Sequence, residues 1–448
     1  MRKLRSWRRV AGIVLLGSCM GLVTSTQAQD DEIIIDIIGG VEGATPIAVV
    51  PFGTDLTELG DDTNFAEVIA ADLARSGQFN PLPQDDMVER PSRFDAVQLG
   101  LWRRLSVDYM VIGHLSADAT GGYKIDMRLI NVLDGQSRLN LAFPTRPGRF
   151  RYTAHYIADK VYEELLGVPG VFRTRIAYVT ASGVGDESRF ALMVADADGH
   201  DPKPVVRSRE PLLSPSWSPD GRKLAYVSFE NRNSSIFLQD IATGSREAIS
   251  SFKGINGAPS FSPDGKSIAL ALSRSGNLEI YKMDLASREL KKLTNHSAID
   301  TEPRWTPDGR AIIFTSDRGG RPQLYKVSAN GDANAERITR QGRYNARASL
   351  SPQGDMVALV HSERANVYRI GVLELEKNYL RIVSDGPLDE SPSFAPNGTM
   401  VLYASKQGQR GVLSAVPVYG NYQADQDAHQ LIFARGDIRE PAWSPIVN

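Results

Sequence analysis

The sequence predicts a mixed α+β domain followed by an all-β six-bladed β-propeller. Three observations carry this prediction. A proline-rich motif recurs every 44 or 45 residues, each repeat holds four short strand-forming runs, and the first part of the chain has no repeat but alternates between helical and strand patterns. A repeat of about 40–45 residues that contains four strands is typical of a propeller blade.

The chain begins with the pattern of a signal peptide. Residues 1–9 carry five basic and no acidic residues, residues 10–23 are apolar, and small residues lead to Ala28. This apolar run of 14 residues is shorter than the roughly 20 that a membrane-spanning helix needs. We expect residues 1–28 to be removed after Ala28. Two alternatives remain open: a retained membrane anchor, and lipid attachment to Cys19, because Leu16-Gly-Ser-Cys19 is similar to a lipoprotein processing site.

The composition after cleavage excludes several kinds of site. Cys19 is the only cysteine, so the remaining chain has no disulfide and no thiolate metal site. Because residues 1–28 hold five of the 51 basic residues, 46 Lys and Arg stand against 53 Asp and Glu. This excess of acidic residues argues against nucleic acid as a partner.

Residues 29–45 are predicted to form a flexible segment that binds a partner. Three acidic residues, ending at Glu32, precede the strand-forming run Ile33-Ile-Ile-Asp-Ile-Ile38, and two glycines follow it. The run has two interpretations. It is either the first strand of the following domain or a free strand that adds to the sheet edge of a partner, and a switch between the two is a third possibility.

Residues 46–168 read as a mixed α/β domain. Periodicity predicts strands at 46–52, 109–113 and 123–131 and helices at 64–76, 96–105 and 154–166. Gly167-Val-Pro-Gly170 ends the last helix and forms a short link to the propeller.

The repeat that defines the propeller is clearest in three copies. They are Pro215-Ser-Trp-Ser-Pro-Asp-Gly221, Pro259-Ser-Phe-Ser-Pro-Asp-Gly265 and Pro303-Arg-Trp-Thr-Pro-Asp-Gly309, with degenerate copies at 348–354 and 392–398. Proline followed by Asp and Gly is typical of a tight turn, so each motif reads as an inner strand that ends in a hairpin. The aromatic residues of the motifs are expected in the core between blades.

Six blades are obtained only when the two ends of the propeller, residues 174–448, are joined. Ile176–Thr180 begins a set of three strands with no motif strand before it, and Pro441-Ala-Trp-Ser-Pro445 is a motif strand with no blade after it. We therefore expect the strand at 441–445 to close the ring, which removes exposed sheet edges.

No enzymatic motif is present. The chain lacks Gly-x-Ser-x-Gly, His-Glu-x-x-His and the sialidase box, and its six histidines have no metal-ligand spacing. Asp196-Ala-Asp-Gly199 with Asp201 is similar to part of a calcium loop, but its later ligands are missing, and a turn between strands explains it better. We predict no catalytic, cofactor or metal site. A peptidase front domain and a propeller that binds a small molecule remain the rival functions.

The loops before the motif strands are the candidate binding surface. They fall on one face of the propeller, where their carboxylates converge on an acidic mouth for a basic partner or serve only as solvated turn residues. These carboxylates are Asp300, Glu302, Asp389, Glu390, Asp437 and Glu440.

In the order of its motifs the chain resembles the TolB family, the periplasmic propellers of the Tol–Pal system of Gram-negative bacteria. The resemblance covers nearly all of the chain after Ala28. It rests on Pro46-Ile-Ala-Val-Val-Pro-Phe52, Ala70-Ala-Asp-Leu73 with Phe79-Asn-Pro-Leu82, Phe172-Arg-Thr-Arg-Ile-Ala-Tyr-Val179, Asn256-Gly-Ala-Pro259, Thr301-Glu-Pro303, Gly320-Arg-Pro-Gln323 and Ala395-Pro-Asn-Gly-Thr-Met400.

The resemblance implies a periplasmic, non-enzymatic adaptor that maintains the outer membrane and its constriction at division. It implies that the mouth binds the peptidoglycan-associated lipoprotein Pal and that the N-terminal segment binds the C-terminal domain of TolA; other envelope proteins are further possible partners. The matching Pal-facing positions are Asn256, Gly257, Ala258, Thr301 and Glu302, to which the mouth adds Asp300, Asp389, Glu390 and Glu440. The TolA-facing positions are Glu32, Ile33, Ile34, Ile35, Asp36, Ile37 and Ile38. One departure from the family pattern is that Gly254 and Ile255 stand where basic or polar residues are expected.

Overall fold

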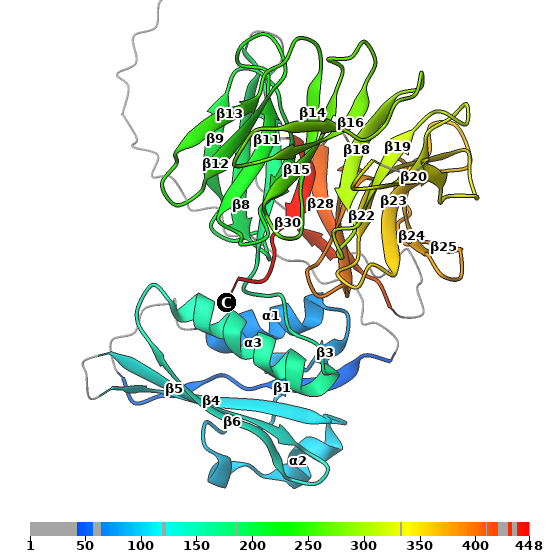
Figure 1. Ribbon diagram of the computed structural model, residues 1–448. Helices are drawn as coiled ribbons and strands as arrows, with labels where there is room; N and C mark the ends of the chain where they lie inside the picture. The colour runs from blue at the N-terminus through cyan, green and yellow to red at the C-terminus, as the bar shows by residue number, and fades with distance from the viewer. Residues whose placement is uncertain are drawn as a thin grey trace, which may run out of the picture. The chain divides into compact units, whose positions relative to one another are not determined.

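The computed structural model describes residues 43–56, 64–118, 122–183, 187–331, 334–408, 410–419, 429–431 and 437–447 (Figure 1). The predicted signal peptide, with Cys19 and Ala28, and the predicted TolA-facing segment Glu32–Ile38 lie outside these residues. The described part of the chain folds into the α+β domain and the six-bladed propeller that the sequence predicts.

The N-terminal domain is a mixed sheet with helices on both faces. Its elements are β1 (Thr45–Val49), β2 (Gly53–Thr54), α1 (Phe65–Arg75), β3 (Phe79–Pro81), α2 (Leu99–Arg104), β4 (Tyr109–Ala117), β5 (Tyr123–Asn131), β6 (Ser137–Thr145) and α3 (Phe150–Leu166). The strand order is β3-β1-β4-β5-β6, with β2 also paired to β4. Strand β1 runs parallel to β3 and β4, whereas β4, β5 and β6 are antiparallel.

Alternation along the strands divides this domain into two cores. Ile47 and Val49 of β1 point to the face that α1 and α3 cover, and Ala48 and Val50 point to the face where Trp102 of α2 packs (Figure 1). Successive side chains of a strand point to opposite faces, so one strand serves both cores.

Local signals set the ends of the helices. The side chain of Asn64 caps α1 by accepting a hydrogen bond from the backbone N–H of Glu67 at 3.3 Å. Helix α3 begins four residues before the predicted start and ends where Gly167 adopts a left-handed conformation with φ of 72°, which glycine accepts at little cost.

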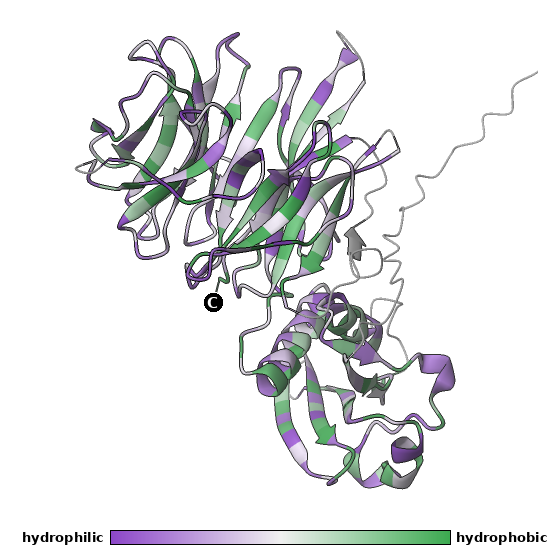
Figure 2. Ribbon diagram, turned by 90° about the vertical axis from the view of Figure 1, so that its right-hand side faces the viewer, coloured by the Kyte–Doolittle hydropathy of each residue, from purple (hydrophilic) through white to green (hydrophobic). Residues whose placement is uncertain are grey.

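The propeller consists of six four-stranded antiparallel sheets. Five blades are continuous in sequence, and in each the strands pair in chain order. The first two blades are β10 (Leu212–Trp217), β11 (Lys223–Ser228), β12 (Ser235–Asp240) and β13 (Arg246–Ser250), then β14 (Asn256–Phe261), β15 (Ser267–Leu272), β16 (Glu279–Asp284) and β17 (Leu290–Lys292). The next three are β18 (Asp300–Trp305), β19 (Ala311–Ser316), β20 (Gln323–Ser328) and β21 (Glu336–Arg337), then β22 (Tyr344–Leu350), β23 (Met356–Ser362), β24 (Arg369–Glu374) and β25 (Tyr379–Ile382), then β26 (Glu390–Phe394), β27 (Met400–Gln407), β28 (Arg410–Pro417) and β29 (His429–Leu431). Hydrophobic residues concentrate on their strands and polar residues in the connections (Figure 2).

The sixth blade joins both ends of the propeller. Strand β30 (Asp437–Trp443) pairs with β7 (Arg175–Ser182), which is followed by β8 (Arg189–Asp196) and β9 (Lys203–Ser208). The side-chain Oγ of Ser444 accepts the backbone N–H of Arg175 at 2.9 Å, and the indole of Trp443 donates to Thr174 at 2.8 Å. The inner strand of this blade therefore comes from the far end of the chain.

Candidate functional site

The first strand of each blade lines the propeller axis. These six inner strands, β30, β10, β14, β18, β22 and β26, surround a central cavity of about 320 Å³, which is lined by their second halves and by the turns that follow them. We call the opposite face of the propeller, where the inner strands begin, the mouth. The motif aromatics Trp217, Phe261, Trp305 and Phe394 are buried in clusters with neighbouring strands, as predicted, and Trp443 is partly buried in another cluster.

Each inner strand carries the same irregularity near the mouth. Its pairing with the second strand shifts by a bulge, and one non-glycine residue there adopts φ between 47° and 55°. These residues are Ser214, Ala258, Glu302, Arg347, Ser391 and Glu440. The left-handed region costs a residue with a side chain about 1–2 kcal/mol. Its recurrence at six equivalent positions gives the mouth a uniform backbone frame.

A charged cluster lies on this frame. The guanidinium of Arg347 contacts the carboxylates of Glu302 at 3.1 Å and Glu440 at 3.4 Å, and it donates to the hydroxyl of Ser391 at 2.6 Å. Burial alone would lower the pKa of Arg347, but the charges of Glu302 and Glu440 raise it above its usual range. Arg347 therefore stays charged and neutralises part of the expected acidic mouth.

The two glutamates also order the backbone. Glu302 accepts the N–H of Arg347 at 3.1 Å and the hydroxyl of Thr315 at 2.8 Å, and Glu440 accepts the N–H of Ser214 from the adjacent blade. A charge-assisted hydrogen bond of this kind is stronger than a neutral one. These carboxylates thus tie blades together at the mouth.

Three of the nine predicted Pal-facing residues are fully buried. The carboxamide of Asn256 accepts the hydroxyl of Ser250 at 2.7 Å and donates to three backbone carbonyls. Asp300 pairs with Arg318 at 2.7 Å, and Asp389 accepts the hydroxyls of two serines, while its burial raises the pKa of its carboxyl. The expected acidic mouth needs correction here, because the side chains of Asp300 and Asp389 hold loops together instead of facing solvent.

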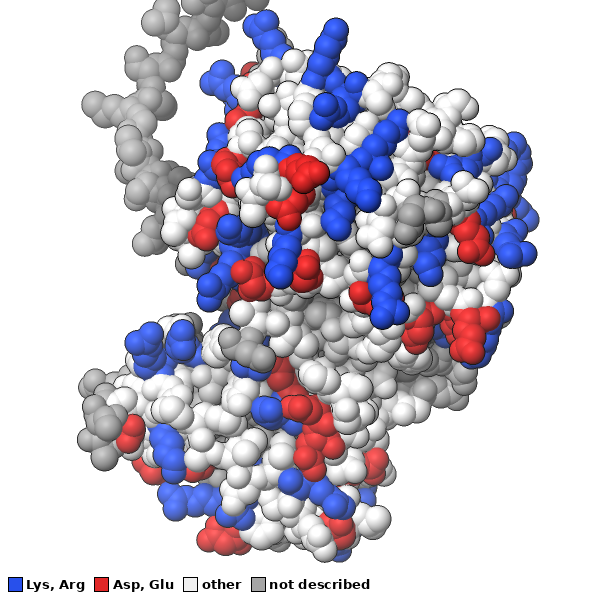
Figure 3. Space-filling model, in the orientation of Figure 1, with Lys and Arg blue, Asp and Glu red and all other residues white. Residues whose placement is uncertain are grey.

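The remaining six predicted positions are accessible. Gly257, Ala258, Thr301, Glu302, Glu390 and Glu440 are all partly exposed at the mouth. Asp437, a further predicted carboxylate, accepts the backbone N–H of Gly411 at 2.7 Å and pairs with Arg439. On the face of the molecule drawn in Figure 3, basic side chains lie among the acidic ones. The acidic side chains on this face therefore do not form a continuous patch.

Three exposed hydrophobic residues accompany these positions. Ile255, Ile299 and Leu388 are 53%, 49% and 40% exposed, and each directly precedes one of the buried residues Asn256, Asp300 and Asp389. We call these three residues the apolar rim. Large exposed hydrophobic side chains with charged neighbours are typical of a protein-binding surface. Ile299 follows Ile255 by 44 residues, or one repeat, and Leu388 follows Ile299 by 89 residues, or two repeats, so the sequence contained a signal for this rim.

A second cluster of ionisable groups joins the N-terminal domain to the propeller. The ligand atoms of Asp72 on α1, His155 on α3 and Asp198 in the β8–β9 turn lie within 4.8 Å of one another. The same carboxylates pair with arginines: Arg75 lies 2.5 Å from Asp72, and Arg151 contacts Asp198. Because guanidinium groups already neutralise both carboxylates, the cluster has the composition of an ion-pair network. The predicted turn at Asp196–Gly199 is confirmed, and Asp198 serves this network.

The cluster shifts the pKa values of its members. Burial alone would lower the pKa of His155, but the charge and hydrogen bond of Asp72 and the charge of Asp198 raise it above its usual range. Burial alone would raise the pKa of Asp198, but the charges of Arg75, His155 and Arg151 lower it to about 2.

None of the helices in the described part of the chain has the length and hydrophobicity that crossing a membrane requires.

Comparison with known proteins gives consistent matches over the whole chain. The family model described as the TolB amino-terminal domain matches residues 33–138, and the one described as the TolB beta propeller domain matches residues 162–447. The Tol-Pal system protein TolB of Xanthomonas oryzae pv. oryzae (strain PXO99A) is 56% identical over 99% of both chains. Its counterpart in Xanthomonas euvesicatoria pv. vesicatoria (strain 85-10) is 58% identical over 95% of both. The crystal structure of TolB from Acinetobacter baumannii matches with a TM-score of 0.84 and 40% identity, covering 93% of this chain and all of that one.

Proposed function

This chain belongs to the TolB family of Tol-Pal system proteins, and from that premise we propose that it is a non-catalytic periplasmic adaptor. Its propeller mouth binds the lipoprotein Pal, and its N-terminal segment Glu32–Ile38 binds the C-terminal domain of TolA. The adaptor connects the outer membrane to inner-membrane Tol proteins, maintains outer-membrane integrity and supports invagination during division. Export by a signal peptide that is cleaved after Ala28 brings it to the periplasm.

The observation that best supports Pal binding is the composition of the mouth. The apolar rim offers hydrophobic surface, and Thr301, Glu302 and Glu390 offer polar groups beside it. A hydrophobic patch bordered by polar groups resembles the centre and edge of a protein–protein interface. The buried residues Asn256, Asp300 and Asp389 contribute by holding the loops that present this surface.

The central experiment measures binding of the purified periplasmic domain of Pal from the same bacterium by calorimetry. We expect Ile299→Ser to weaken binding about tenfold, because truncating a hydrophobic contact at an interface centre costs about 1–2 kcal/mol. Leu133→Ser is the matched control, since Leu133 is an exposed leucine of the N-terminal domain. Equal affinities for wild type and Ile299→Ser would remove the apolar rim from the proposal.

The polar positions require a second variant. The double substitution of Thr301 and Glu302 by alanine is expected to weaken Pal binding more than either single change. Because Glu302 also holds Arg347, the melting temperature of each variant is measured alongside, and Glu302→Gln shows whether the charge or the hydrogen bonds matter. Full affinity in the double variant would argue against this part of the mouth.

The N-terminal segment is tested independently. Deletion of residues 32–38 from the cleaved chain is expected to abolish binding of the TolA C-terminal domain and to leave Pal affinity within twofold. Substitution of Ile34 and Ile37 by serine keeps the length and should weaken TolA binding in the same direction. Retained TolA binding in both variants would place that contact elsewhere in the chain.

The form of the exported protein follows from one mass measurement. A mature chain that begins at Gln29 agrees with cleavage after Ala28, and a diacylglyceryl adduct on Cys19 would contradict it. The same experiment separates these outcomes from a retained leader.

A further inference from the structure

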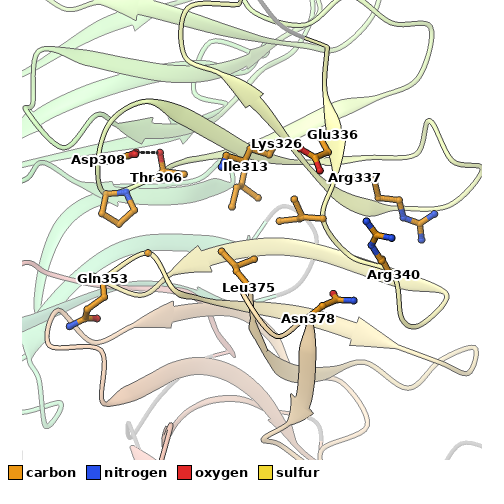
Figure 4. A pocket seen from close by; sticks show the side chains of 13 residues that line it. Thr306, Asp308, Ile313, Lys326, Glu336, Arg337, Arg340, Gln353, Leu375 and Asn378 are labelled. Carbon is orange, nitrogen blue, oxygen red and sulfur yellow. Dashed lines mark hydrogen bonds between the residues drawn. The ribbon is translucent and has the colours of Figure 1, made fainter.

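A groove lies between two neighbouring blades of the propeller, β18–β21 and β22–β25, and the mouth residues do not line it. Its volume is about 430 Å³, within the range of about 300–1,000 Å³ that small-ligand sites occupy. Ile313 and Leu375 lie in its middle (Figure 4), and Ile338 also lines it. This apolar middle favours a ligand with an aliphatic part.

The two ends of the groove carry opposite charges. Asp308 lies at one end, and Arg337 and Arg340 lie at the other (Figure 4). Asp308 uses its Oδ1 to accept the hydroxyl of Thr306 at 2.5 Å and the backbone N–H of Arg310. Its second oxygen has no hydrogen-bond partner among the residues that the structure describes and can accept from a ligand. The hydrogen bond from Thr306 lowers the pKa of Asp308, and the carboxylate is charged at neutral pH.

The basic end has free donors. Arg337 donates its Nε to the carbonyl of Thr339 at 2.6 Å, which orients the guanidinium, and its Nη atoms have no hydrogen-bond partner among the described residues. The side chain of Arg340 likewise forms no ion pair or hydrogen bond within the described part of the chain. Exposed guanidinium groups recognise a carboxylate by paired hydrogen bonds.

We propose that this groove binds a short peptide with free ends, whose α-carboxylate lies against Arg337 and Arg340 and whose α-amine lies against Asp308. The small side chains of the peptide contact the apolar middle. Lys326 and Glu336 also line the groove, between its two ends (Figure 4). An inorganic anion would use only the cationic groups Lys326, Arg337 and Arg340, and a polyanion would also meet the negative charges of Asp308 and Glu336. A zwitterionic ligand with an aliphatic middle is the class that satisfies both ends and the centre together.

Calorimetry with the cleaved full chain and trialanine tests the proposal. We expect a dissociation constant on the order of 1 mM. Amidation of the C-terminus or acetylation of the N-terminus should each weaken binding about tenfold, because each removes a charged partner. Arg340→Ala should produce the same loss for trialanine but little further loss for the amidated peptide, which assigns that end.

Matched variants complete the experiment. Arg321→Ala changes an exposed arginine of the same blade outside the groove and should leave trialanine binding unchanged. Asp308→Asn keeps an oxygen that accepts the turn hydrogen bonds and should weaken only peptides with a free amine. Melting temperatures show that the variants are folded. Pal affinity of Arg340→Ala should equal that of wild type, so failure here is distinct from failure at the mouth.

Three outcomes would overturn the inference. The first is the absence of trialanine binding at several millimolar. The second is equal binding of the free, amidated and acetylated peptides, which would mean that neither charged end is recognised. The third is displacement of trialanine by inorganic phosphate without any effect of Asp308→Asn, which would mean that the groove holds an anion only.

Discussion

At the scale of single residues, Asp300 illustrates a polar side chain with a structural role at the edge of a candidate binding surface. Its side chain is fully buried and lies 2.7 Å from Arg318, whose guanidinium also stacks on Phe314 and Tyr325. Removal of one partner from a buried ion pair leaves an uncompensated charge, which costs far more than the loss of an exposed pair.

We predict that Asp300→Ala lowers the free energy of unfolding by about 3 kcal/mol. Urea denaturation measures this change. Asp126→Ala is the control, because Asp126 pairs with Lys124 at the surface, where both side chains are about half exposed, and it should change stability by at most about 0.5 kcal/mol. Similar effects of the two substitutions would contradict the structural role of Asp300.

His155 gives the stability a defined pH dependence. Its folded-state pKa is raised, so its stabilising contribution is complete below its unfolded pKa of about 6.5 and is lost as the pH rises through the folded-state value. The groups that face it are Asp72 from α1 and Asp198 from the propeller, with Arg75 and Arg151 beside them. Protonated His155 therefore bridges two carboxylates of different domains.

We predict that His155→Gln destabilises the protein more at about pH 5.5 than at about pH 8.5, since only the lower pH charges the imidazole. Unfolding by urea at both values gives the difference. In an Asp72→Asn background this pH dependence should become smaller, because Asp72 is the main cause that raises the pKa. The same loss at both pH values would mean that His155 contributes only packing.

The direction of individual side chains at the mouth could be predicted from the sequence only in part. The spacing of the motif prolines located the loops before the inner strands, and Thr301 and Glu302 are accessible there. The spacing did not predict that Asp300 points inward. A bulge between Thr301 and Arg304 shifts the register, so simple alternation along the strand fails at this point.

At the scale of elements, each inner strand contains one non-glycine residue in the left-handed conformation. A side chain makes this conformation unfavourable in free energy, so the same local strain occurs in all six blades. The sequence does not predict this left-handed conformation, because the six positions hold serine, alanine, glutamate and arginine instead of glycine.

Ser214→Gly should therefore raise the free energy of unfolding by about 0.5–1 kcal/mol, because relief of the left-handed strain exceeds the added entropy of glycine in the unfolded chain. Ser216→Gly, two positions along the same strand and without positive φ, should lower it by about as much. Thermal unfolding of both variants gives the comparison. A loss of stability in Ser214→Gly would contradict strain at this position.

Prediction of the elements was most reliable where periodicity was strong. The turn motifs and the runs that follow them identified the blades, whereas β3 and β6 of the N-terminal domain were not predicted. Strand β3 has only three residues. Strand β6 lies at a sheet edge and contains Pro144, which weakens a strand signal. Its alternating Leu139, Leu141 and Phe143 were the available evidence.

At the scale of the whole molecule, closure of the ring depends on β30. This strand completes the blade of β7, and its Ile438 and Trp443 pack with residues of that blade and of β27 and β28. Without it, β7 would expose an unpaired edge.

Deletion of residues 437–448 should lower the melting temperature by about 10 °C, since the lost burial costs on the order of 5 kcal/mol. A chain that ends at Ile446 keeps β30 and is the control. Differential scanning calorimetry measures both, and an unchanged melting temperature in the longer deletion would contradict closure by this strand.

The pairing of β30 with β7 also has a consequence in time. Arg175 and Ser444 are 269 residues apart, and a ribosome produces the N-terminal end first. The blade that begins with β7 must wait, one strand short, until the other five blades have been made, and contacts of such high sequence separation form slowly. This blade is therefore complete only when the whole propeller chain is present, and in a truncated product β7 keeps an unpaired sheet edge.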